Sequence, residues 1–150
     1  MLDINRAKEA FDNFLFIMED RLEAIEAEGE KHGISLEPTM DSLEKLELLF
    51  FKLSENITED ERNSLIVSFA RYVGEIVRIT YNGKWHLSLA DPKNIYYNYP
   101  VLIGHTPIDG LAFSPIHTMR VVWLRKKQGL LRRIIMADIK PRDFHFEPEQ

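Results

Sequence analysis

Apolar residues recur at helical spacing along the first part of the chain. Ile4, Phe11, Met18 and Ile25 return every seven residues, and charged residues fill most positions between them. This spacing places apolar side chains on one face of an α-helix. We therefore expect one long amphipathic helix over about residues 5–31.

Two helix-start signals divide the residues that follow. Asp41 precedes Glu44 by three positions, and Thr58 precedes Glu61 by three positions, which is the pattern of a capping box. Leucine and phenylalanine recur at helical spacing after each signal. The pattern predicts a second helix that starts at Asp41 and a third helix from Thr58 to about Thr80.

The pattern then changes from helical spacing to alternation. After the turn signal at residues 82–83, the apolar residues Trp85, Leu87 and Leu89 alternate with polar ones, which is typical of a strand. A second strand candidate covers residues 99–104. We expect the two strands to pair as an antiparallel hairpin, followed by an irregular link or a third short strand.

The last part of the chain again predicts helices. Ser114 is a favourable N-cap, and Pro115 suits the first helical position. One helix is expected over residues 116–128 and a short one over residues 130–139, with a loose tail from about residue 142. The predicted order is three N-terminal helices, a small antiparallel sheet and two C-terminal helices, which is an α+β fold.

Length and composition support one domain and exclude several protein classes. The chain has 150 residues, of which 45% are hydrophobic, and it has no cysteine. We expect a single α+β domain over residues 1–150. Disulfide frameworks and cysteine-ligated metals are excluded. Because the start lacks a signal-peptide pattern and apolar runs are short, a soluble cytoplasmic protein is the expectation.

Charge is divided unevenly between the two halves of the chain. Residues 1–75 carry 18 acidic and 8 basic side chains, whereas residues 76–150 carry 6 acidic and 11 basic ones. Six cations gather within 14 residues: Arg120, Arg125, Lys126, Lys127, Arg132 and Arg133. They form a candidate surface for an acidic partner or for phosphates. Alternatively, they satisfy helix C-termini or face the acidic half of the same domain.

Motifs for catalysis, phosphate cradles and metal binding are missing from the sequence. It contains no GxSxG, SxxK, GxxxxGK[ST], GxGxxG or HExxH pattern. The five histidines include no pair at the i, i+4 spacing of a helical zinc site. We therefore predict no catalytic residues, no metal site and no cofactor.

One glycine inside a strong helical pattern suggests a close contact. Gly74 costs a helix about 1 kcal/mol relative to alanine, which indicates that another part of the chain packs closely there. Trp85 could fold back over it. The corner is then either a structural junction with a surface ion pair or a ligand pocket. In a pocket, Glu75 would serve as acid/base and Arg78 as anion clamp.

These residues also carry a resemblance to a known family. The segment YVGEIVRITYNGKW, followed by Pro100-Val101 and by Ser114-Pro115, resembles a motif order in an uncharacterised bacterial domain family of unknown function. The motif is Tyr-x-Gly-Glu-x-x-Arg followed by Gly-x-Trp, and the upstream segment MDSLEKLELL is similar too. The resemblance covers about residues 36–137. It implies, by analogy with small bacterial proteins encoded beside toxin genes, an immunity-type binding role.

We therefore expect a non-catalytic intracellular binding protein, immunity-type or regulatory, that acts on an unknown protein partner. One alternative is a small-molecule-binding protein or enzyme at the Gly74 corner. Another is nucleic-acid binding through the basic stripe, which the pI of about 5.6 disfavours. A homodimer through the N-terminal helix is also open, because Phe14, Phe16 and Ile17 widen its apolar stripe.

Overall fold

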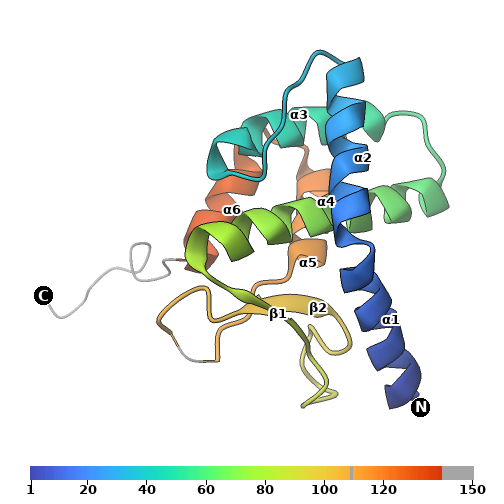
Figure 1. Cartoon of the computed structure of the whole chain (residues 1–150), viewed down its shortest axis with the longest axis vertical. Helices are drawn as coiled ribbons and strands as arrows, with labels where there is room; N and C mark the ends of the chain where they lie inside the picture. Colours follow the sequence, from blue (N-terminus) through green and yellow to red (C-terminus); the bar gives the residue numbers. More distant parts are fainter. Residues whose placement is uncertain (109, 140–150) are drawn as a thin grey trace, which may run out of the picture.

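A computed structural model describes residues 1–108 and 110–139 of the chain. Within them the fold is α+β with one two-stranded antiparallel sheet, as the sequence predicts, but it has six α-helices where five were expected (Figure 1). The tail expected from about residue 142 lies outside the described residues. No described helix is both long and apolar enough to pass through a membrane.

The N-terminal segment forms two helices, so the prediction of one long helix is wrong. Helix α1 (Ile4–Phe16) and helix α2 (Met18–Lys31) are separated at Ile17, whose ψ of 11° leaves the helical region. The two helices pack against different parts of the molecule (Figure 1). Phe14 of α1 contacts Trp85, whereas α2 packs on α4. The bend at Ile17 lets both apolar faces be buried.

The next segment begins with a turn of 3-10 helix, η1 (Met40–Ser42), which leads into α3 (Leu43–Leu53). The expected capping box at Asp41 is wrong, because α3 begins at Leu43 and has no side-chain cap. The Glu44 side chain is used elsewhere: it forms an ion pair with Arg132 of the last helix. Glu44 therefore pairs with a residue far along the chain and not with the backbone at the start of its own helix.

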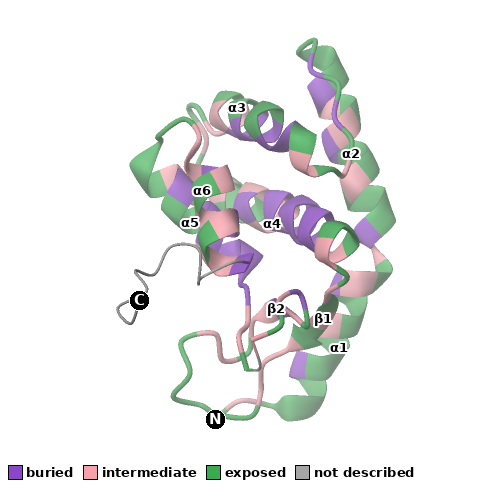
Figure 2. Cartoon of the chain, turned by 90° about the vertical axis from the view of Figure 1, so that its left-hand side faces the viewer, coloured by how far each residue is buried: buried purple, intermediate pink, exposed green. Residues whose placement is uncertain are grey.

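Helix α4 (Glu59–Tyr81) is the central element of the fold. Its predicted capping box is confirmed: Glu61 donates its N–H to Thr58 Oγ1 at 3.1 Å, and Thr58 donates to Glu61 Oε1 at 2.9 Å. The helix ends at Asn82, which has a positive φ of 58°. Figure 2 shows that burial is more continuous along α4 than along α1 or α2.

The predicted hairpin is confirmed, with shorter strands than expected. Strand β1 (Lys84–Leu87) pairs antiparallel with β2 (Pro100–Ile103), and Trp85 lies opposite Leu102. The link that follows forms a single bridge between Phe113 and Leu102. The two-stranded sheet thus packs beside α4.

Two helices complete the described fold: α5 (Pro115–Arg125) and α6 (Leu130–Ile139). Ser114 caps α5 as predicted, since its Oγ accepts the N–H of His117 at 3.3 Å. The helix ends three residues earlier than expected, because Lys126 adopts a left-handed conformation with φ of 51°. The described chain therefore has four α-helices before the sheet, not three, and two after it.

Candidate functional site

The predicted contact between Gly74 and Trp85 is confirmed. A Cβ atom placed on Gly74 would overlap the benzene part of the Trp85 indole and would lie 3.2 Å from Pro115 Cγ. The ring of Phe14 meets the indole edge-on, with centroids 5.1 Å apart. The indole is thus held between α4, α1 and the start of α5, where only glycine leaves room for it.

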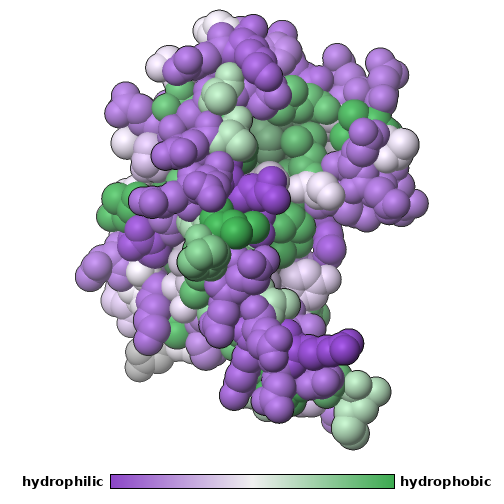
Figure 3. Space-filling model, turned by 45° about the vertical axis from the view of Figure 1, so that its right-hand side comes forward, coloured by the Kyte–Doolittle hydropathy of each residue, from purple (hydrophilic) through white to green (hydrophobic). Residues whose placement is uncertain are grey.

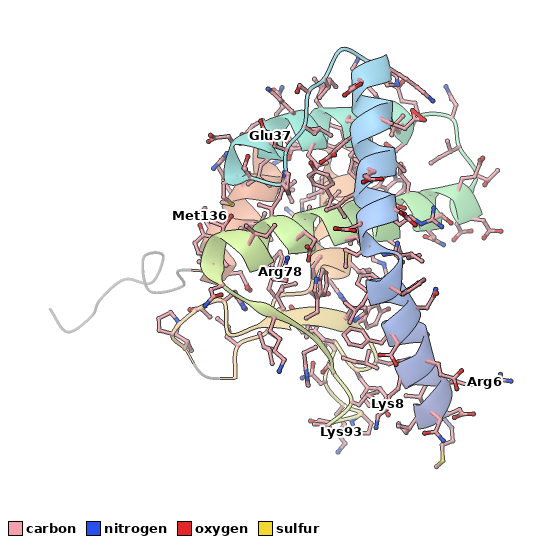
Figure 4. All side chains as sticks on the ribbon, viewed as in Figure 1. Arg6, Lys8, Glu37, Arg78, Lys93 and Met136 are labelled. Atoms are coloured by element: carbon pink, nitrogen blue, oxygen red, sulfur yellow. The ribbon has the colours of Figure 1, made fainter. Side chains whose placement is uncertain are left out.

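Glu75 is buried beside this contact and is surrounded by donors. Its Oε2 accepts the Trp85 Nε1–H at 2.8 Å and the Arg78 Nε–H at 2.8 Å, while Oε1 accepts from Arg78 Nη2 at 2.9 Å. The hydrogen bond to Glu75 raises the pKa of Arg78. Arg78 lies on the side of α4 that faces the hairpin (Figure 4). Glu75 therefore ties the helix to the strand by charge-assisted bonds.

The four residues of this corner contact one another and are packed against Phe14 and Pro115. Three cavities, which lie beside α3, between α2 and α4, and between α1 and the hairpin, include none of Gly74, Glu75, Arg78 and Trp85 in their linings. The indole occupies the space above Gly74. An acid/base role for Glu75 would first require loss of these hydrogen bonds. The ligand pocket at this corner stays a prediction, and the contacts favour the structural alternative.

Three members of the basic cluster have partners within the fold. Arg120 donates to the Tyr99 hydroxyl at 3.1 Å. Arg132 forms two hydrogen bonds with Glu44, at 2.7 and 3.0 Å, and these lower the pKa of that carboxyl. Lys126 donates to a backbone carbonyl of the last turn of α5 at 2.7 Å. These contacts reduce the number of cations that are free to meet a partner.

The other three members, Arg125, Lys127 and Arg133, are exposed. None of them forms a salt bridge with another residue in the described part of the chain. Leu124, next to Arg125, is 70% exposed. An exposed apolar side chain thus adjoins cations at the C-terminal end of α5.

A groove of about 550 Å³ runs beside this surface, between α3 and the turn from α5 to α6. Leu48 and Phe51 contribute its apolar part, and Lys126 contributes a cation. The complete lining is Glu44, Glu47, Leu48, Phe51, Lys126, Gln128 and Gly129. The groove combines apolar side chains with one cation and the carboxylates of Glu44 and Glu47, and its apolar part could serve a partner as an anchor site.

Two histidines are held by neighbouring side chains. His105 is buried, with Nε2 3.1 Å from Asp138 Oδ2. His117 Nδ1 lies 2.7 Å from Ser114 Oγ, and burial lowers the pKa of His117. Among residues 1–108 and 110–139, no group of three or more histidine, aspartate or glutamate side chains could hold a metal ion.

Comparisons with protein-family models, with curated proteins and with solved structures gave no significant match. The resemblance to an uncharacterised bacterial family stays an expectation from the motif alone.

Sequence reasoning missed the role of Glu47. This carboxylate is buried on α3 and accepts the N–H groups of Gly129 at 2.8 Å and Leu131 at 2.9 Å. It therefore caps the N-terminus of α6 from another helix. The signal available in the sequence was a charged residue on the apolar stripe of α3, four positions after Leu43.

Proposed function

We propose that this protein is a non-catalytic binding protein that recognises an acidic protein partner through the end of α5 and the adjoining groove. The observation that carries the proposal is that exposed Arg125 and Lys127 lie next in sequence to exposed Leu124 and to Lys126 of the groove, with exposed Arg133 on the helix that follows. We refer to these three cations as the basic corner.

Charge and shape together define the partner chemistry. Carboxylates on the partner would meet the basic corner, which speeds association and selects against basic proteins. An apolar side chain of the partner would enter the groove beside Leu48 and Phe51. Buried anchors of this kind supply most of the binding free energy at protein interfaces, while peripheral charges supply specificity.

An immunity-type or regulatory role in the cytoplasm is the concrete form of this proposal. Neutralising a toxin requires a stable surface and no catalytic group. The hydrogen bonds of Glu75 with Arg78 and Trp85 favour a structural role for Glu75 over a catalytic one. The predicted homodimer remains an alternative partner, since Phe16 of α1 is 87% exposed.

The test is capture from cells of the source organism with three forms of the full chain. The wild type is compared with R125E/K127E and with K8E as a control, because Lys8 is also exposed but lies on α1. Cross-linked partners are identified by mass spectrometry after nuclease treatment. We expect a protein that the wild type and K8E retain and that R125E/K127E loses.

Two outcomes would contradict the proposal. One is that every captured protein binds R125E/K127E as well as the wild type. The other is that capture disappears on nuclease treatment and a gel-shift series shows binding that weakens steeply with salt, which would favour nucleic acid.

A further inference from the structure

Arg71 is a buried cation without a buried anion. It is 8% exposed on α4, its Nε donates to the Phe14 carbonyl at 3.4 Å, and its guanidinium carbon lies 4.4 Å from the centre of the Phe14 ring. Within the described residues, no carboxylate forms a salt bridge with it. A guanidinium has five N–H donors, and since no Arg71 nitrogen is a fully buried atom without a partner, its remaining donors face the solvent-accessible cavities that Arg71 lines.

A second arginine lies next to it. Arg21 of α2 lines the same cavity, and no salt bridge of Arg21 is found in the described part of the chain either. Burial lowers the pKa of Arg71, and the nearby charge of Arg21 lowers it further. Two adjacent cations repel each other, and burial of one of them carries a desolvation cost. An anion placed between them would offset both effects.

The cavity between α2 and α4 is suited to such an anion. Its volume is about 460 Å³, and its lining is Arg21, Asn63, Ser64, Val67, Ser68 and Arg71. Ser64, Ser68 and Arg71 come from one face of α4, since they are spaced four and three residues apart. Apart from Val67, every lining side chain can donate a hydrogen bond, and none is acidic.

A second cavity adjoins Arg71 from the other side. It has a volume of about 280 Å³, and α1 and the hairpin supply most of its lining, including Asn13 and Asn98. Arg71 therefore lies between two cavities, with the Arg21 side the more strongly cationic. The side of the molecule in Figure 3 is largely hydrophilic, with smaller apolar areas between the polar residues.

We propose that the α2–α4 cavity is a phosphate site, which binds inorganic phosphate or the phosphate group of a small monoester. Two guanidinium groups, two hydroxyls and an amide provide donors from several directions, which matches the four oxygens of a tetrahedral dianion better than a planar carboxylate. The lining has no aromatic side chain on which a nucleobase could stack. Recognition is therefore of the phosphate group itself.

The site is independent of the proposed partner surface. It shares no residue with the basic corner or with the groove beside α3. Failure of either proposal therefore leaves the other unaffected.

The experiment is a titration of the full chain with inorganic phosphate and, separately, with glycerol 3-phosphate, at constant ionic strength. Binding is measured by isothermal titration calorimetry and by amide shifts in two-dimensional NMR spectra. Because Arg21 is exposed, R21A should fold normally. R6A is the matched control, since Arg6 is also exposed but lies on α1, outside the lining.

We expect saturable one-to-one binding by the wild type and R6A, with shifts at residues 63–71, and about tenfold weaker binding by R21A. Tighter binding of glycerol 3-phosphate identifies a monoester as the ligand, and tighter binding of inorganic phosphate identifies the free ion. The proposal is overturned if binding does not saturate, if chloride causes the same shifts, or if R21A binds phosphate as tightly as R6A does. R71M, compared by its NMR spectrum with the wild type, must also lose the phosphate shifts.

Discussion

Two regions of α4 bury charge in opposite ways. At the end near β1, the Glu75 carboxylate accepts hydrogen bonds from Arg78 and Trp85, each of 2.8–2.9 Å. About one helical turn earlier, Arg71 is buried to a similar extent as a residue, but among the described residues its guanidinium donates a single long bond, to a backbone carbonyl. The Glu75 carboxylate is thus satisfied by donors within the fold, whereas Arg71 lines two cavities. We call the Glu75 end of α4 the closed region and the surroundings of Arg71 the open region.

The difference distinguishes a structural junction, at Glu75, from a candidate ligand site, at Arg71. A buried charge whose hydrogen bonds are all made inside the fold stabilises the contact between its elements, and removing it leaves unpaired partners. A buried charge with unused donors beside a cavity contributes little to the fold until an anion arrives.

The largest expected effect is at the closed region. In G74A, the new methyl group overlaps the Trp85 ring, and neither the helix backbone nor the packed indole can move freely. We expect a loss of about 3 kcal/mol in the free energy of unfolding, measured by urea denaturation. G74A/W85A should lose less than the sum of the two single variants. A loss in G74A below about 0.5 kcal/mol would contradict the close packing.

Removing the Glu75 carboxylate should be the next largest effect. In E75L, the Trp85 N–H and the Arg78 guanidinium lose their acceptor, so we expect a loss of about 2 kcal/mol in urea denaturation. E75Q keeps one acceptor oxygen and should lose only about half as much. Equal stability of E75L and the wild type would show that this corner is not a structural junction.

The Glu44–Arg132 pair serves as a reference for the two buried charges, because both of its side chains are partly exposed to solvent. The folded pKa of Glu44 lies below its ordinary value of 4.5, so the pair stabilises the fold above that pH. The contribution is lost as the pH falls through the folded pKa. E44Q should therefore be about 0.5 kcal/mol less stable than the wild type at pH 7, and this difference should shrink as the pH falls through the folded pKa. A difference that grows on acidification would contradict this sign.

The smallest effect is expected at the open region. R71M removes a charge without a carboxylate partner and keeps an unbranched side chain over the Phe14 ring. In buffer without phosphate, we expect its free energy of unfolding to stay within about 0.5 kcal/mol of the wild type. A loss of about 2 kcal/mol, as in E75L, would mean that Arg71 is a structural residue like Glu75.

The sequence predicted the features that depend on neighbours in the chain. The capping box of Thr58 and Glu61, the N-cap at Ser114 and the turn before β1 are local patterns, and each is confirmed. The contact of Gly74 with Trp85 was also predictable, because only ten residues separate the helix position from the strand that follows it.

Sequence reasoning failed where a distant partner decided the structure. Glu44 has the spacing of a capping residue, but Arg132, 88 positions later, offers two charge-assisted bonds. The heptad pattern of the first segment continues without interruption, and only the separate docking of Phe14 and α2 places a bend at Ile17. Arg71 interrupts the apolar face of α4 without any local signal that its donors would lack partners.

By itself, then, the order of amino acids set the α+β class, most helix starts and the pairing of the hairpin, because short-range hydrogen bonds and the spacing of apolar residues act within a few positions. The tertiary structure alone decided which charges are satisfied: Glu75 and Glu47 find donors, whereas Arg71 and Arg21 face a cavity. Whether a buried charge is paired depends on distances between elements far apart in the chain, and no local pattern encodes those distances.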